Sequence, residues 1–86
     1  MYRVVYLAEV VQKQIPKLSL PVKSRIKKAI EKKLTIDPIA FGKPLQYSLK
    51  GLRRLRVGDY RIVYKVDASE KRVIVLNIAH RKEVYE

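Results

Sequence analysis

The stretch Leu-Arg-Arg-Leu-Arg-Val-Gly-Asp-Tyr-Arg-Ile-Val-Tyr-Lys-Val, residues 52–66, decides the fold. Two apolar-polar alternating runs, 52–57 and 60–66, flank Gly58 and Asp59. A two-residue Gly-Asp connection between such runs predicts a β-hairpin in which glycine supplies positive φ. With these two residues as the loop, Val57 faces Tyr60 and Arg56 faces Arg61. Because neighbouring residues of a strand point to opposite faces, this register fixes the composition of both faces.

The two predicted faces differ sharply in charge. One is apolar and is expected to face the core: Leu55, Val57, Tyr60, Ile62 and Tyr64. The other gathers cations around two apolar residues: Leu52, Arg54, Arg56, Arg61, Val63 and Lys65. Cross-strand neighbours stand only about 4.5 to 5.5 Å apart at Cβ, so like charges there are unfavourable. The face is therefore either a preformed anion site, since guanidinium groups bind phosphate in bidentate fashion, or a solvated face screened by salt.

The rest of the chain predicts one α+β domain over residues 1–86. Residues 2–7 form a β-branched and aromatic run that predicts a strand, and a helical pattern starts at Ala8 and is expected to kink or end at Pro16. A second helix follows a Ser19 cap and has apolar residues at helical spacing: Val22, Ile26, Ala29, Ile30 and Leu34. Residues 37–44 predict an irregular connection, and residues 71–79 a last strand. The order is β-α-α-β-β-β, with both helices packed on one face of a small, mainly antiparallel sheet.

Composition narrows the function. Twenty Lys and Arg oppose 8 Asp and Glu, a net charge of +12 that predicts a nucleic acid or an acidic protein as partner. There is no cysteine and one histidine, so we expect no metal and no cofactor. The longest apolar run, Val4 to Ala8, is far below the ~20 residues of a membrane span, and no signal-peptide pattern is present. A cytoplasmic protein without a membrane partner is expected.

Two stretches carry a family resemblance: Gly51 to Tyr64, preceded by Leu49-Lys50, and Ile-Ala-His-Arg-Lys-Glu-Val-Tyr at residues 78–85. Together they resemble the RelE/ParE superfamily of bacterial and archaeal toxins, in its RelE branch. The resemblance implies a ribosome-dependent endoribonuclease that cuts mRNA in the decoding (A) site, in contact with rRNA. It also implies a cognate RelB-like antitoxin as the inhibiting partner. Cleavage would proceed by attack of the ribose 2′-OH on the adjacent phosphate, which DNA cannot support.

By position, the resemblance makes Arg61 the arginine that stabilises charge on the scissile phosphate. It makes Arg81 and Tyr85 the C-terminal arginine and tyrosine of the site, and Arg54 the replacement for an active-site lysine. Leu52 stands where another active-site lysine is expected, so Arg53 or Lys50 would substitute for it, or His80 would transfer the proton. The remaining residues expected to bind RNA are also basic: Arg56, Lys65 and Lys82.

Two alternatives remain open. A ParE-type toxin would inhibit DNA gyrase on the same fold without cleaving nucleic acid. A non-catalytic basic RNA-binding module is favoured by the departure at Leu52. The joint presence of Arg61, Arg81 and Tyr85 favours the endoribonuclease.

Overall fold

The computed structural model describes residues 1–46 and 50–83. Its strands are β1 (Arg3–Tyr6), β2 (Lys43–Pro44), β3 (Arg53–Val57), β4 (Tyr60–Asp67) and β5 (Arg72–His80). Its helices are α1 (Leu20–Ala29) and α2 (Pro38–Phe41), with π-helical turns η1 (Val10–Gln14) and η3 (Ile30–Leu34) and 3-10 turns η2 (Ile15–Lys17) and η4 (Arg81–Glu83). The predicted α+β class and order of the main elements are confirmed.

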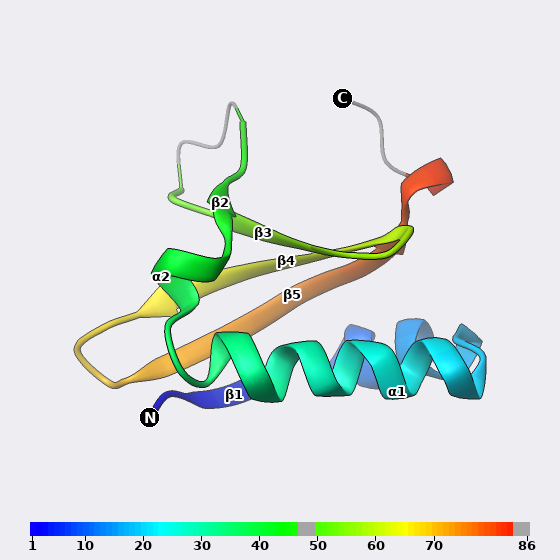
Figure 1. Cartoon of the computed structure of the whole chain (residues 1–86), viewed down its shortest axis with the longest axis horizontal. Helices are drawn as coiled ribbons and strands as arrows, with labels where there is room; N and C mark the ends of the chain where they lie inside the picture. The colour runs from blue at the N-terminus through cyan, green and yellow to red at the C-terminus, as the bar shows by residue number, and fades with distance from the viewer. Residues whose placement is uncertain (47–49, 84–86) are drawn as a thin grey trace.

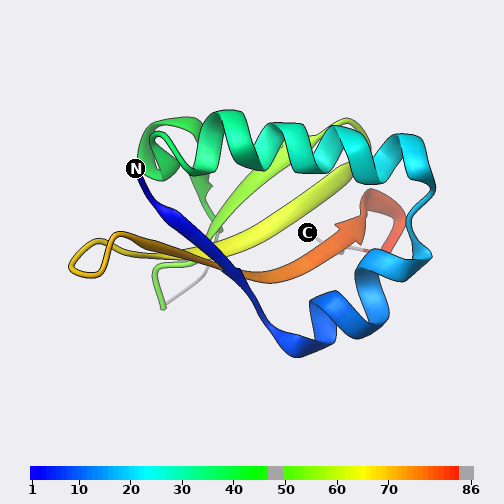
Figure 2. The same cartoon turned by 90° about the horizontal axis from the view of Figure 1, so that it is seen from below.

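The strands form one five-stranded sheet in the order β1-β5-β4-β3-β2. Strand β1 runs parallel to β5, and every other neighbouring pair is antiparallel. Helix α1 and the first helical segment, formed by η1 and η2, lie on the same side of the sheet (Figure 1). Seen from that side, α1 crosses the sheet and the first helical segment lies beside β5 (Figure 2). Among the residues that the structure describes, no helix covers the opposite side of the sheet (Figure 1).

Helix α1 begins as the sequence predicts. The Ser19 Oγ accepts a hydrogen bond from the Val22 amide at 3.4 Å, and Pro21 occupies the first turn. The helix continues through η3 as far as Leu34, and its apolar stripe faces the sheet, with Ile26, Ile30 and Leu34 buried. They pack with Leu55, Ile62, Tyr64 and Val10 into the single core cluster of the described residues.

The first helical segment, η1 and η2, extends the edge of the sheet. Pro16 lies within the 3-10 turn η2, which ends at Lys17 with Leu18 in an extended conformation, so the helical segment continues just past the proline. Strand β1 accompanies β5 only from Arg72 to Val75, so the later half of β5 has no strand on that side within the described chain. The Gln14 Oε1 instead accepts a hydrogen bond from the Ile78 amide at 2.7 Å. A side chain thus replaces the missing strand and ties this segment to β5.

The connection after η3 is ordered, which corrects the prediction of an irregular segment over residues 37–44. It contains α2, capped by a hydrogen bond from the Ala40 amide to the Asp37 Oδ1 at 3.1 Å, and the short strand β2. The buried Tyr64 hydroxyl donates to the Pro38 carbonyl oxygen at 2.5 Å, and a Cβ at Gly42 would collide with that hydroxyl. The sequence signals for turns were right, but contacts from the distant strand β4 give the segment its structure.

Within the described residues, no helix is long and apolar enough to cross a membrane, and no three His, Asp or Glu side chains are grouped so that they would hold a metal ion.

Candidate RNA-binding and catalytic groove

The hairpin register matches the prediction at every pair. Strands β3 and β4 pair Val57 with Tyr60, Arg56 with Arg61, and Leu55 with Ile62. Leu55 and Ile62 are buried, so the predicted apolar face does lie against the core. The charged face therefore points to the side of the sheet that carries no covering helix.

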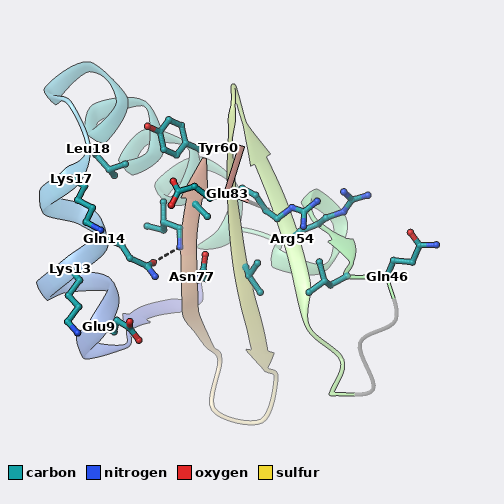
Figure 3. Close-up of a pocket in the computed structure, with 15 residues that line it drawn as sticks. Glu9, Lys13, Gln14, Lys17, Leu18, Gln46, Arg54, Tyr60, Asn77 and Glu83 are labelled. Atoms are coloured by element: carbon teal, nitrogen blue, oxygen red, sulfur yellow. Dashed lines mark hydrogen bonds between the residues drawn. The ribbon is translucent and has the colours of Figure 1, made fainter. Parts of the chain in front are cut away.

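That open face forms the floor of a groove of about 850 Å³, here called the sheet groove. Figure 3 shows its two sides: Arg54 and Gln46 lie at one margin, and Glu9, Lys13 and Lys17 of the first helical segment stand at the other. The floor and far end are lined mainly by β4, β5 and η4: Tyr60, Arg61, Val63, Asn77, Ile78, Ala79 and Glu83. Its width and mixed charge suit an extended polar ligand.

Arg61 is the central cation of this floor. It stands opposite Arg56 on β3 and opposite Ala79 on β5, whose small side chain leaves the guanidinium room. Burial lowers the pKa of Arg61, and the positive charge of Arg54 lowers it further. Both effects disfavour the cation, and an anion between Arg54 and Arg61 would offset the repulsion between their charges. The electrostatics therefore favour binding of phosphate between these arginines.

Arg81 approaches from the C-terminal end of β5. Its backbone amide donates to the Asp59 carbonyl oxygen at 2.8 Å, and its Nε lies 3.8 Å from the Asp59 Oδ1. Arg56 also contacts the hairpin turn, with its Nε donating to the Gly58 carbonyl oxygen at 3.1 Å. The turn thus brings two of the predicted cations together at one end of the sheet.

These two arginines, with Lys82, also line a second groove of about 670 Å³. This edge groove lies along β3, on the side where β2 pairs only with Arg53 and Arg54. Its lining residues come from six elements and the hairpin turn: Lys33, Phe41, Lys43, Arg54, Leu55, Arg56, Asp59, Tyr60, Arg61, Arg81 and Lys82. Arg54, Tyr60 and Arg61 line both grooves, so the two grooves adjoin at these residues.

The structure does not place Arg53 with the other predicted RNA-binding residues. Arg53 pairs with Tyr64 and shares its face, on the core side of the sheet. Its Nη2 donates to the carbonyl oxygens of Ile39 and Gly42, at 2.5 and 2.8 Å. These two hydrogen bonds hold α2 against the sheet, and they place the Arg53 guanidinium on the opposite face from Arg54 and Arg61.

His80 also lies away from Arg54 and Arg61. Its ring packs edge-on against Tyr60, with centroids 5.1 Å apart, and lines a small pocket with Val22 and Arg25 of α1. Its Nδ1 accepts a hydrogen bond from the Lys82 amide at 3.1 Å. These contacts are those of a residue that organises the C-terminal turn.

Two further predicted cations do not line either groove, and one predicted site residue lies outside the described part of the chain. Lys65 is exposed on β4 and Lys50 is exposed before β3, and neither is among the described residues that line the two grooves. Tyr85 lies outside the described residues. The cations that the structure does bring together are Arg54, Arg56, Arg61, Arg81 and Lys82.

Several lining residues were not predicted. Glu9, Lys13 and Lys17 recur every four residues, a spacing that marks one face of a helix and would have grouped them. Glu83 lines the sheet groove, and its Oε1 accepts a hydrogen bond from the His80 amide at 3.2 Å. Phe41, Lys33 and Lys43 have no sequence signal that links them to the arginine strands, because only the folded chain brings them together.

Comparison with known families gives a match over almost the whole chain. The family described as ParE toxin of type II toxin-antitoxin system, parDE, matches residues 5–85. Among curated proteins, the toxin RelE of Mycobacterium tuberculosis is 45% identical over 49 residues, which are 57% of this chain and 50% of that protein. The toxin RelG of the same organism is 36% identical over 52 residues, 60% of each chain. The chain thus matches only half to three-fifths of the length of these curated relatives.

Solved structures agree on the fold. The toxin-antitoxin complex RelBE2 from Mycobacterium tuberculosis contains a chain that superposes with a TM-score of 0.83 at 28% identity, covering 93% of this chain and 98% of that one. The archaeal RelE-RelB complex from Pyrococcus horikoshii gives 0.69 at 26% identity, with 96% and 98% covered. The isolated E. coli RelE toxin, at 22% identity and a TM-score of 0.76 over 93% and 84%, shares the fold. By the near-complete family match and these relatives, the chain belongs to the ParE toxin family of the RelE/ParE superfamily.

Proposed function

We propose that this chain is the toxin of a type II toxin-antitoxin system and acts as a ribosome-dependent endoribonuclease on mRNA. The observation that carries the proposal is that Arg61, on the floor of the sheet groove, and Arg54, at its margin, line the same groove, with Arg81 following the end of β5. Guanidinium groups carried by the paired strands β3 and β4 start from a fixed backbone, so they need little rearrangement when charge develops on a phosphate.

The reaction would begin with attack of a ribose 2′-OH on its adjacent phosphorus. The bond between phosphorus and the 5′-oxygen then breaks, leaving a 2′,3′-cyclic phosphate, and the departing 5′-oxygen takes a proton from water to become the 5′-hydroxyl. Arg54 and Arg61 would stabilise the additional negative charge of the pentacoordinate transition state. Removing one such donor typically lowers the rate about 10²- to 10³-fold.

An arginine does not accept the proton of the 2′-OH, because it stays protonated at working pH. Glu83 is the carboxylate that lines the sheet groove from the Arg81 end, and the proposal assigns it this proton. His80, whose Nδ1 is already bonded, would act by holding the Lys82–Glu83 turn in place. Tyr85 is assigned the role of a surface on which an mRNA base stacks.

The proposed partner is a cognate RelB-like antitoxin. Structures of similar chains are described as RelB-RelE complexes from Pyrococcus horikoshii and as the RelBE2 complex from Mycobacterium tuberculosis. A net charge of +12 favours an acidic inhibitor and equally favours contact with rRNA and mRNA in the ribosomal A site.

The test is a defined translation reaction in which mRNA 5′ ends are mapped by primer extension, with and without ribosomes. Wild-type protein is expected to cut only when ribosomes are present, and Arg61→Ala to lose at least a hundredfold in rate. Arg3→Ala removes the same charge from an exposed position on β1 and is the matched control. Undiminished cleavage by Arg61→Ala would refute the site assignment.

The ParE-type alternative has one specific support, which is that the matching family description names ParE. Under that alternative the protein would leave mRNA intact and inhibit DNA gyrase. A supercoiling assay with purified gyrase separates the two activities, because the endoribonuclease is expected to leave supercoiling unchanged.

A further inference from the structure

We propose that the edge groove binds single-stranded RNA next to the scissile phosphate, with Phe41 as a surface on which an unpaired base stacks. The inference rests on the proposed function and adds a second contact region to it. Single-stranded nucleic acid is commonly bound by a cationic groove that follows the backbone and by aromatic side chains that stack on bases. The edge groove has both features.

Its charge is strongly positive. One carboxylate lines it, that of Asp59, whose Oδ1 lies 3.8 Å from the Nε of Arg81. Seven cations line it: Lys33, Lys43, Arg54, Arg56, Arg61, Arg81 and Lys82. The cations come from η3, which continues α1, from β2, and from β3, β4 and η4. A phosphate chain can therefore meet cations along the whole groove.

Phe41 is the unexplained aromatic residue of this groove. It is 48% exposed at the end of α2, although a phenyl ring gains from burial. Its neighbours on this segment are fixed, because Arg53 binds the carbonyls of Ile39 and Gly42 and Tyr64 binds that of Pro38. The ring is thus presented on a rigid support, as a stacking surface requires.

Adjacency to the sheet groove favours RNA over an acidic peptide as the occupant. Arg54, Tyr60 and Arg61 line both grooves, so a strand whose phosphate lies at Arg61 can continue directly into the edge groove. An acidic peptide would use the cations but would gain little from the exposed faces of Phe41 and Tyr60, whereas every base has a face that stacks.

The test is a fluorescence-anisotropy titration of the purified protein with a short, fluorescein-labelled single-stranded RNA. Phe41→Ala is expected to weaken binding by about fivefold to a hundredfold, the range found when a stacking aromatic is removed, and Phe41→Trp to restore it. Ile39→Ala is the matched control, because Ile39 is exposed to a similar degree on α2 but does not line the edge groove. The same RNA as a duplex should not distinguish Phe41→Ala from wild type, since its bases are already stacked.

A second variant tests the cations. Lys33→Ala/Lys43→Ala is expected to lower the slope of log affinity against log salt by about 1.4, the value for two phosphate contacts on a single strand. Lys27→Ala/Lys28→Ala removes equal charge from exposed positions of α1 outside the groove and should leave most of that slope. Equal slopes for the two double variants would overturn the proposal.

The two proposals fail separately. Ribosome-dependent cleavage by wild type together with unchanged RNA affinity in Phe41→Ala would overturn the edge groove alone. RNA binding that depends on Phe41, without any mRNA cleavage, would support the groove and overturn the enzymatic function. Binding of poly-glutamate that depends on Phe41, with RNA binding unaffected, would assign the groove to an acidic peptide and overturn the proposal.

Discussion

Arg81 is bound twice by Asp59, a residue of the hairpin turn. The Arg81 amide donates to the Asp59 carbonyl oxygen at 2.8 Å, and the Arg81 Nε lies 3.8 Å from the Asp59 Oδ1. The side chains are 65% and 61% exposed, so the ion pair contributes little to stability and the main-chain bond fixes the start of η4. The effect left to the Asp59 carboxylate is on the direction in which the Arg81 side chain points.

Asp59→Ala should therefore separate binding from catalysis. The main-chain bond survives, so the free energy of unfolding should change by less than about 1 kcal/mol. Loss of a carboxylate should tighten RNA binding, while the less well directed Arg81 should lower kcat by roughly two- to tenfold. The checks are anisotropy and single-turnover cleavage, with Glu70→Ala as the control of equal charge at the far hairpin. Identical kcat values in the two variants would contradict the positioning effect.

Gly58→Ala should expose coupling between the hairpin turn and α1. Gly58 has φ of 60°, a left-handed conformation that costs other residues about 1–2 kcal/mol. A Cβ there would also lie 2.8 Å from an Nη of Arg25, so the guanidinium would have to move. Urea unfolding of both single variants and the double variant should show that Gly58→Ala costs less when Arg25 is already alanine, with a coupling of about 0.5 kcal/mol or more. Strictly additive costs would show that the contact has no energetic role.

The pair Arg56 and Arg61 predicts a salt-dependent stability. Directly opposite like charges destabilise a sheet by about 0.2–1 kcal/mol, and added salt screens that repulsion. The free energy of unfolding of wild type, measured relative to Arg61→Ala, should therefore rise with NaCl concentration. The same substitution should abolish most cleavage, which would mean that the arginine face is retained for function at a cost in stability. A relative stability that is constant with salt would argue against repulsion.

The hairpin and its arginine face were predictable because their rules are local. A two-residue loop sets the register between β3 and β4, and the register sets the faces. The same rule places Arg53 opposite Tyr64, on the core face, yet its nearness in sequence to the missing lysine suggested a role in RNA binding. Parity along the strand is thus a better guide than proximity in the chain.

The rim of the site was not predictable, because it depends on long-range contacts. Residues 37–44 are predicted as a loop, and their order comes from hydrogen bonds of Arg53 to Gly42 and of Tyr64 to Pro38, which are 11 and 26 residues apart in the chain. Phe41 enters the edge groove only through those contacts. The side chain of Gln14 likewise bonds the amide of Ile78, which is 64 residues further along the chain.

Arg53→Ala should be a stability variant. Its Nη2 bonds the carbonyls of Ile39 and Gly42, and hydrogen bonds from charged groups contribute about 1.5–3 kcal/mol each. Truncation should therefore cost about 2–4 kcal/mol in urea unfolding. Arg53→Lys keeps the charge but not the fork, so it should recover only part of this loss. Arg3→Ala, exposed on β1, should change stability by less than about 0.5 kcal/mol, and an equally small effect of Arg53→Ala would refute the clamp.

The hydrogen bonds of Asp67 at the β4–β5 turn should make the free energy of unfolding fall at acid pH. Hydrogen bonds from the Ser69 hydroxyl, at 2.8 Å, and from the Glu70 amide, at 3.2 Å, lower the pKa of Asp67, and Arg72 lowers it further. Since the pKa is lower in the folded than in the unfolded chain, the unfolded chain binds the proton more readily. The carboxylate's contribution is therefore complete above the unfolded pKa of about 3.9 and disappears as the pH falls through the folded value. Urea titrations between about pH 2 and 7 should show a steeper acid loss of stability for wild type than for Asp67→Asn, with the two curves converging at the lowest pH. Parallel curves over that range would mean that the turn does not stabilise the ionised form.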